Sequence, residues 1–149
     1  MMTLLDANVL VYAVNADAPQ QSASRAVLQA AMVGRLLGVL VPQVLLEFFA
    51  VITNARRVQH PLPPEVAWSQ VTLLRTSLPV LPIAPASLDV LDALVRDQRP
   101  TGAKVFDLFL VAQMRAHLVN TICTYNTADF AAVPGIAAVT PELLLASLP

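Results

Sequence analysis

Short apolar runs alternate with longer helical segments along this chain, and this alternation limits the possible folds more than any other feature. The strand candidates are residues 3–5, 36–41, 80–83, 120–125 and 137–139. The helix candidates are residues 9–14, 19–33, 42–58, 64–78, 87–96 and 106–118, and a final short helix begins at Pro141. Strands separated by helices form right-handed βαβ units around a parallel sheet. We therefore expect an α/β fold in which residues 1–149 form one domain.

Proline and serine residues predict several helix starts. Pro42, Pro64 and Pro141 stand where apolar helical patterns begin, and proline is favoured in the first turn of a helix. Ser87 is the expected N-cap of the helix that follows it. In a sheet of parallel strands, ligands bind at the carboxyl ends of the strands, so side chains that directly follow the strand candidates are the first to consider.

The composition argues against a membrane protein. The chain is 56% hydrophobic, but its richest region, residues 36–52, is interrupted by Pro42, Gln43 and Glu47 and is shorter than the ~18 uninterrupted apolar residues that a span requires. The first residues lack the basic region of a signal peptide. The single cysteine, Cys123, fits a reducing compartment, so we expect a cytoplasmic protein. The net charge of −1 means that any polyanion must be bound by a local patch or through metal ions.

One charged residue stands out within an apolar helix, in the stretch VLLEFFAV (residues 44–51). An unpaired buried carboxylate costs several kcal/mol or stays protonated. The residues three and four positions away from Glu47 are Gln43, Val44, Ala50 and Val51, which provide no local ion pair. Because Glu47 is in mid-helix, it cannot serve as a cap, and a functional role is the better explanation for its charge.

Three further acids accompany Glu47 in or beside segments that are expected to be core. Asp6 follows the first strand, Asp107 begins an apolar helix, and Asp129 follows the strand at 120–125. Each has a structural alternative: Asp6 and Asp107 could be helix N-caps, Asp107 could pair with Lys104, and Asp129 could form an Asx turn. Together, however, the four positions fit the carboxyl edge of one sheet.

A cluster of carboxylates points to a divalent cation. Clustered carboxylates repel one another, and a cation relieves that repulsion. Hard oxygen ligands without a nearby set of cysteines and histidines favour Mg²⁺ or Mn²⁺ over structural zinc. One or two such ions suit phosphodiester hydrolysis, in which the metal activates a water and no protein nucleophile is needed.

Four stretches, in this order, resemble the PIN domain and, more narrowly, the VapC-type toxins of bacterial toxin–antitoxin modules. They are LLDANVLVYA, LLEFFAVI, KVFDLFLVAQM and TYNTADF, and the resemblance covers essentially the whole chain. It implies a three-layer sandwich with a five-stranded, mostly parallel sheet flanked by helices. It also implies an endoribonuclease that depends on Mg²⁺ or Mn²⁺, forms a homodimer and is neutralised by a cognate antitoxin.

The resemblance assigns roles residue by residue. Asp6, Glu47 and Asp107 match the three central acids of the family, and Asp129 matches its fourth, more variable position. Asn8 matches a polar residue that orients the first aspartate. Thr124 and Asn126 fall where the family often has polar groups at the edge of the site. Some relatives carry an acid where this chain has Asn126, so the number of metal ions stays open.

Basic residues supply weaker candidates for contact with RNA. Lys104 is three residues before Asp107 and is a candidate for phosphate contact. Four arginines could together form the local patch that the net charge requires: Arg56, Arg57, Arg96 and Arg99. Arg115, after the apolar LFLVAQM stretch, could line the groove or bind a carboxylate of a partner. His60 and His117 show no metal-ligand spacing, and Cys123 is expected to be a buried strand thiol.

Two other classes of protein fit part of this pattern. The first is an aspartate-based, Mg²⁺-dependent α/β phosphatase or receiver-like domain, with Asp6 as nucleophile or metal ligand. The stretch Asp6-Ala7-Asn8 lacks the second aspartate of those phosphatases, and Glu47 would have no role there. The second is a non-catalytic binding partner whose acids are structural, which the high hydrophobic content keeps open.

Overall fold

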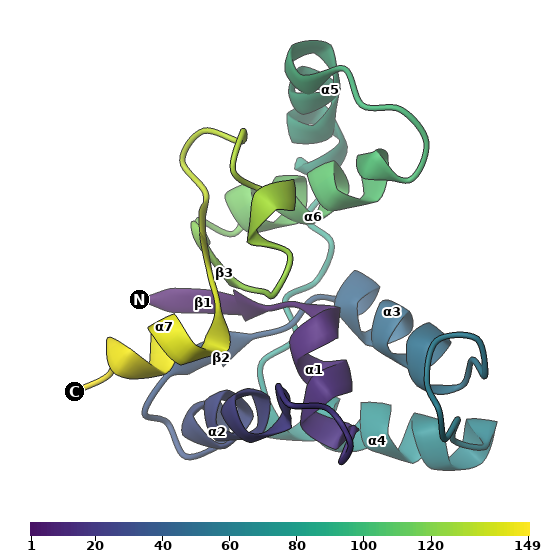
Figure 1. Ribbon diagram of the computed structural model, residues 1–149. Helices are drawn as coiled ribbons and strands as arrows, with labels where there is room; N and C mark the ends of the chain where they lie inside the picture. The colour runs from purple at the N-terminus through teal and green to yellow at the C-terminus, as the bar shows by residue number, and fades with distance from the viewer.

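The computed structural model describes all residues, 1–149, and shows the predicted α/β fold (Figure 1). The strands are β1 (Met2–Leu5), β2 (Leu37–Val39), β3 (Thr121–Cys123) and β4 (Ala137–Val139). The helices are α1 (Ala7–Val14), α2 (Gln21–Met32), α3 (Pro42–Ile52), α4 (Pro64–Ser77), α5 (Ser87–Gln98), α6 (Lys104–Ala116) and α7 (Pro141–Ala146), with a 3₁₀ turn η1 (Thr127–Asp129). Proline opens α3, α4 and α7 as predicted.

The sheet is entirely parallel, with strand order β2-β1-β3-β4. It has four strands instead of the five that the resemblance implied. The fifth candidate, residues 80–83, contributes only a single parallel bridge, between Val80 and Leu40 at the outer edge of β2. The bridge is made by Leu40 N to Pro79 O and Leu81 N to Leu40 O, and the next bond of the ladder would need an N–H from Pro42, which has none and opens α3.

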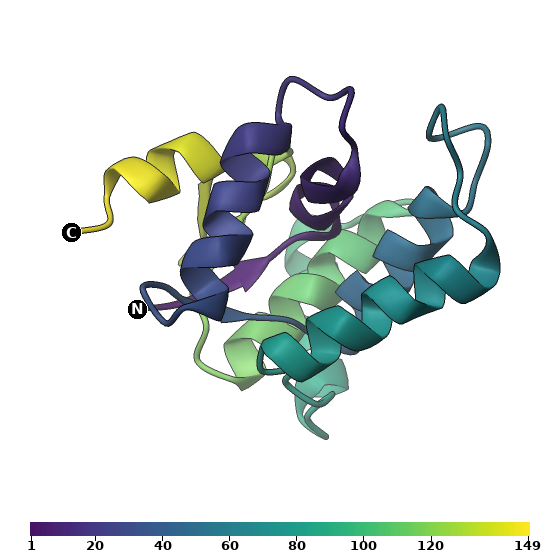
Figure 2. The same ribbon diagram turned by 90° about the horizontal axis from the view of Figure 1, so that it is seen from below.

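Helices cover both faces of the sheet and complete a three-layer arrangement. The pair α5 and α6 lies on one side, and α1 and α2 lie on the other (Figure 1). From below, α2 lies across the sheet in the foreground (Figure 2). A core cluster of 33 buried residues fills the layers. Phe48 belongs to it, whereas Phe49 is half-buried and packs edge-to-face on Trp68. No helix combines the length and the apolar character that a membrane crossing requires.

Most helix ends lie within two residues of the prediction, and two features of the helix ends differ for a clear reason. The helix expected over residues 42–58 ends at Ile52, because Asn54 turns the chain and its Oδ1 accepts a hydrogen bond from Arg56 N at 2.9 Å. Ser87 is not an N-cap: Ala86 occupies that position, and Ser87 is buried inside the first turn with no partner for its hydroxyl.

Leu118 has a strained backbone conformation that the sequence analysis did not predict. It follows α6 in the left-handed conformation, with φ of 58°, and its side chain is 92% exposed. The hydrogen bond from Val119 N to Met114 O, at 2.8 Å, closes the helix around it. Left-handed backbone costs an L-residue other than glycine roughly 1–2 kcal/mol, and this leucine gains almost nothing from burial.

Leu118→Gly is therefore expected to stabilise the fold, by up to about 1 kcal/mol after the extra unfolded-state entropy of glycine is counted. The measurement is the urea midpoint of unfolding. The matched control is Leu88→Gly, at a leucine that is 67% exposed but inside α5, which should lower the midpoint. A lower midpoint for Leu118→Gly would contradict this account of the turn.

Candidate active site

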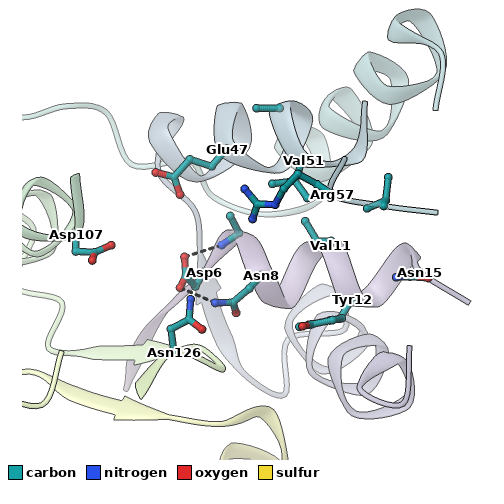
Figure 3. A pocket seen from close by; sticks show the side chains of 13 residues that line it. Asp6, Asn8, Val11, Tyr12, Asn15, Glu47, Val51, Arg57, Asp107 and Asn126 are labelled. Atoms are coloured by element: carbon teal, nitrogen blue, oxygen red, sulfur yellow. Dashed lines mark hydrogen bonds between the residues drawn. The ribbon is translucent and has the colours of Figure 1, made fainter. Parts of the chain in front are cut away.

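Three of the four predicted acids line a single pocket at the carboxyl edge of the sheet (Figure 3). Asp6 follows β1, Glu47 projects from the middle of α3, and Asp107 lies in the first turn of α6. Asn8 and Asn126 line the same pocket. Its volume is about 420 Å³, within the range of natural ligand sites. Three carboxylates that are far apart in the sequence therefore line the same pocket.

Asp6 is the most tightly held of the three acids. It is the N-cap of α1, and its Oδ1 accepts a hydrogen bond from Ala7 N at 2.7 Å. Its Oδ2 accepts two more, from Thr124 Oγ1 at 2.7 Å and from Asn8 Nδ2 at 3.1 Å. The capping interpretation of Asp6 is confirmed, and the same residue lines the pocket.

Asn8 and Thr124 fix Asp6 to the sheet. The Asn8 side-chain amide also donates to Thr124 Oγ1 at 3.0 Å, and its oxygen accepts from Tyr125 N at 3.1 Å. Thr124 Oγ1 in turn accepts from Asn126 N at 3.0 Å. This network joins α1 to the chain that follows β3, so the side chain of Asp6 has a defined direction before any ligand binds.

The pKa of Asp6 is raised above its ordinary value, and burial of the carboxyl is the main cause. The hydrogen bonds from Thr124 and Ala7 lower this pKa, and the negative charges of Glu47 and Asp107 raise it. The charged form of Asp6 is thus disfavoured by desolvation and by its acidic neighbours, which a nearby cation would offset.

The raised pKa of Asp6 gives a prediction for stability against pH in metal-free buffer. Because the folded pKa lies above the unfolded value of 3.8, the contribution of Asp6 to stability is present below pH 3.8 and is lost as pH rises through the folded pKa. The unfolding free energy of the wild type, relative to Asp6→Asn, should fall over this window. Urea unfolding with EDTA at a series of pH values measures it, and a difference that is constant or grows with pH would contradict the assignment.

Glu47 has a helical partner that the sequence analysis missed. Gln43, one turn earlier on α3, donates from Nε2 to Glu47 Oε1 at 2.9 Å and also to Phe106 O at 2.9 Å. The buried Gln113 of α6 donates to Gln43 Oε1 at 2.9 Å. The i, i+4 spacing of Gln43 and Glu47 was the available signal, but only ion pairs were considered. This chain of amides joins α3 to α6 and orients Glu47.

Asp107 and Asp129 are joined by Lys104 on the rim of the pocket. Lys104 Nζ lies 3.4 Å from Asp107 Oδ2 and 3.6 Å from Asp129 Oδ1, and it donates to Asp129 O at 2.8 Å. The predicted pair of Lys104 and Asp107 is confirmed, whereas Asp107 is not an N-cap, because Ala103 holds that position. Asp129 is exposed on η1 and does not line the pocket.

The carboxylates fit a divalent cation in chemistry, although they are not gathered around one point. No three acid, histidine or cysteine side chains are close enough to form a ready-made metal cluster. Glu47 is only half-buried, and Asp107 is 37% exposed, so both have room to turn toward Asp6. Carboxylate oxygens are the ligands that Mg²⁺ and Mn²⁺ prefer, and such an ion would stabilise the charged form of Asp6, whose pKa is raised mainly by burial and less by the charges of Glu47 and Asp107.

One face of α1 and its C-cap supply three pocket residues that the sequence analysis did not select. Val11, Tyr12 and Asn15 line the pocket together with Asn8, which was selected. Their spacing of three, four and seven residues places them on one side of a helix, and that periodicity could have found them. Tyr12 also packs edge-to-face on Tyr125, with ring centroids 5.2 Å apart.

Of the five arginine candidates, only Arg57 lines the pocket. Arg96 pairs with Asp92 at 3.1 Å on the surface of α5, and Arg99 ends the same helix. Arg115 Nη2 donates to Pro134 O at 2.6 Å. These contacts do not bring the arginines into the single patch that the sequence analysis considered.

The histidines and the cysteine have structural surroundings. His60 lies 3.7 Å from Asp17, and His117 contacts Pro82 O at 2.6 Å. Cys123 is buried in β3 as predicted, and burial raises the pKa of its thiol to about 12. A thiol with such a pKa stays protonated and is a poor nucleophile.

Comparison with known proteins identifies one sequence family. The family model described as "PIN domain" matches residues 3–136. No curated protein matches the sequence. Among solved structures, the fold is similar to VapBC2 of Rickettsia felis bound to a DNA fragment from their promoter, with 16% identity, a TM-score of 0.67, and coverage of 94% of this chain and 98% of that chain.

Two further solved structures share the fold. The Sarcin-Ricin loop cleaving toxin VapC20 of Mycobacterium tuberculosis is 16% identical, with a TM-score of 0.64 and coverage of 88% of this chain and 95% of that chain. A toxin-antitoxin complex from Klebsiella pneumoniae is 19% identical, with a TM-score of 0.60 and coverage of 93% and 97%. At these identities, the structural likeness establishes the fold.

Proposed function

The chain belongs to the PIN domain family, and from this premise we propose that it is a metal-dependent endoribonuclease, the VapC-type toxin of a type II toxin–antitoxin module. One observation carries the proposal: carboxylates from three separate elements, Asp6, Glu47 and Asp107, line one pocket at the carboxyl edge of the sheet. Because the family model matches residues 3–136, we no longer favour the phosphatase-like and receiver-like classes that the sequence left open. The toxins among the structural neighbours support the narrower assignment.

In this proposal, Asp6, Glu47 and Asp107 hold one or two Mg²⁺ or Mn²⁺ ions. Such an ion, when bound, activates water and stabilises charge on the phosphoryl oxygens. Thr124 and Asn8 orient the carboxylate of Asp6 through hydrogen bonds of 2.7 and 3.1 Å. Gln43 orients the carboxylate of Glu47 in the same way.

Lys104 and Asp129 act at the rim of the pocket. Lys104 keeps Asp107 and Asp129 together and presents a positive charge that is 41% exposed, so it can reach a phosphate of the substrate. Asp129 supports a second ion or positions the attacking water, and Asn126 contacts the substrate at the edge of the pocket. An acidic pocket in a chain of net charge −1 repels RNA on its own, so the metal also supplies the attraction.

The proposal extends to partners and organisation. Residues 1–149 act as one cytoplasmic domain that forms a homodimer and is neutralised by a cognate antitoxin. The solved complexes of related fold, from Rickettsia felis and Klebsiella pneumoniae, support an antitoxin partner. Exposed apolar side chains on α3 and α4, Leu46, Trp68 and Leu73, offer surface for such contacts.

The test is cleavage of total bacterial RNA by the purified protein, with fragment ends mapped by sequencing. The protein is stripped with EDTA and then supplied with Mg²⁺, Mn²⁺ or neither, and single-stranded DNA is a parallel substrate. We expect new RNA ends at a few sites only when metal is present. If the folded protein cuts nothing with either ion, or cuts equally in EDTA, the proposal fails and the non-catalytic alternative replaces it.

A further inference from the structure

A single cation, Arg57, lines the acidic pocket. The pocket wall contains three carboxylates and one guanidinium. Figure 3 shows that Arg57 comes from the segment after α3 and that its guanidinium points into the pocket, on the same side as Glu47 and Asp6. A positive group placed among carboxylates would ordinarily be explained as their counter-ion, and the contacts decide whether that explanation holds.

Arg57 is not the counter-ion of the acids. No carboxylate lies within ion-pair distance of its guanidinium, whereas Arg96 and Lys104 both have acidic partners. The guanidinium therefore faces the pocket with its charge uncompensated and its donors free. A guanidinium in this state is suited to an anion with several acceptor oxygens.

The turn after α3 holds the backbone of Arg57 in place. Asn54 O accepts hydrogen bonds from Arg57 N at 2.9 Å and from Val58 N at 3.1 Å. Leu62 N then donates to Ile52 O at 2.8 Å, which ties the returning chain to the end of α3. This tight turn aims Arg57 at the pocket, while the adjacent Arg56 does not line it.

We propose that Arg57 binds a backbone phosphate of the RNA, next to the phosphate at which cleavage occurs, and so positions the strand in the pocket. The inference rests on the proposed ribonuclease function. The scissile phosphate would bind at the metal ion that Asp6, Glu47 and Asp107 hold. Because no carboxylate of the pocket lies within ion-pair distance of the Arg57 guanidinium, Arg57 reaches the phosphate next to the one that the acids hold. A planar guanidinium binds phosphate oxygens through two parallel hydrogen bonds.

A second hollow indicates the direction of the strand beyond Arg57. This hollow, of about 200 Å³, shares Val11, Asn15 and Val58 with the acidic pocket and is mostly apolar. Arg57 immediately precedes Val58 in the chain. An RNA strand that runs from the three carboxylates past Arg57 would therefore place the following nucleoside in this apolar hollow. An apolar surface suits a base more than a phosphate.

The test compares Arg57→Gln with Arg56→Gln, which removes the same charge from the same turn but outside the pocket. The first readout is steady-state cleavage of an RNA site found by mapping. For Arg57→Gln, we expect KM to rise about tenfold with kcat changed little, because a substrate-positioning contact is lost. Arg57→Lys should recover part of the loss, since it restores the charge without the paired donors.

The second readout is binding of a fluorescein-labelled single-stranded RNA across a series of salt concentrations, with Ca²⁺ in place of Mg²⁺ or Mn²⁺ so that the carboxylates are neutralised, and with a gel to check that the RNA stays intact. Loss of one phosphate contact should make the slope of log K against log[salt] shallower by about 0.7 for Arg57→Gln, and Arg56→Gln should keep the wild-type slope. If wild type cleaves RNA but the two glutamine variants are indistinguishable in KM and slope, the inference is overturned and the ribonuclease function stands. An Arg57 that instead holds a carboxylate of an inhibitory protein would give this result. If wild type does not cleave RNA, the function fails and the inference fails with it.

Discussion

Asp6→Asn is expected to reduce RNA cleavage at least about a hundredfold while the protein remains folded. Asparagine is nearly isosteric and keeps an acceptor for the capping bond from Ala7 N, but it removes the negative charge at the best-held position in the pocket. Loss of a residue that only supports a metal ligand typically costs 10–100-fold in activity, so loss of a ligand should cost at least the upper end of that range. The measurement is kcat/KM on a mapped RNA site with saturating Mn²⁺.

The matched control is Asp89→Asn, which removes one aspartate charge from the exposed surface of α5, outside the pocket. It should cleave like wild type. Circular dichroism establishes that both variants are folded. A folded Asp6→Asn that retains wild-type kcat/KM would remove Asp6 from the catalytic assignment.

Mn²⁺ is expected to raise the melting temperature of the wild type and to have much less effect on Glu47→Gln. A ligand at about 100 times its dissociation constant stabilises the folded state by about 2.7 kcal/mol, which corresponds to roughly 5–10 °C for a chain of this size. Glutamine at position 47 can still accept the hydrogen bond from Gln43 Nε2. The melting temperature in EDTA should therefore stay near that of the wild type while most of the Mn²⁺-induced shift is lost.

Glu65→Gln provides the control for this experiment, because Glu65 is exposed in the first turn of α4 and lies outside the pocket. Its Mn²⁺-induced shift should equal that of the wild type. If Glu47→Gln keeps the full shift, the ion binds elsewhere. If it melts far below the wild type in EDTA, Glu47 has a structural role that the network with Gln43 does not reveal.

The sequence predicted the elements that depend on local patterns. Proline-opened helices appear where expected, and the alternation of apolar strands with helices correctly gave a parallel sheet. The errors lie where one side chain or backbone partner decides the outcome. Asn54 ends α3 early by turning the chain, and Pro42 stops the pairing of residues 80–83 with β2 after a single bridge. Both residues were visible in the sequence, but their effect depends on the backbone partner that each one meets.

The candidate site was predictable in its central acids and less so at its edges. Asp6, Glu47 and Asp107 could be selected because charges in apolar segments are conspicuous, and topology brings them to one pocket. The placement of Asp129 outside the pocket depends on the 3₁₀ turn and on Lys104. The hydrogen bond between Gln43 and Glu47 and the direction of Arg57 are tertiary details, because they depend on helix packing and on a turn that no periodicity encodes.

The most direct test of the central claim is to locate Mn²⁺ in crystals of the wild-type protein by its anomalous scattering. The account predicts a peak in the pocket, with carboxylate oxygens of Asp6, Glu47 and Asp107 as ligands after Glu47 and Asp107 turn toward Asp6. A protein that cleaves RNA with Mn²⁺ in solution, but whose crystals bind the ion away from these three carboxylates, would contradict it.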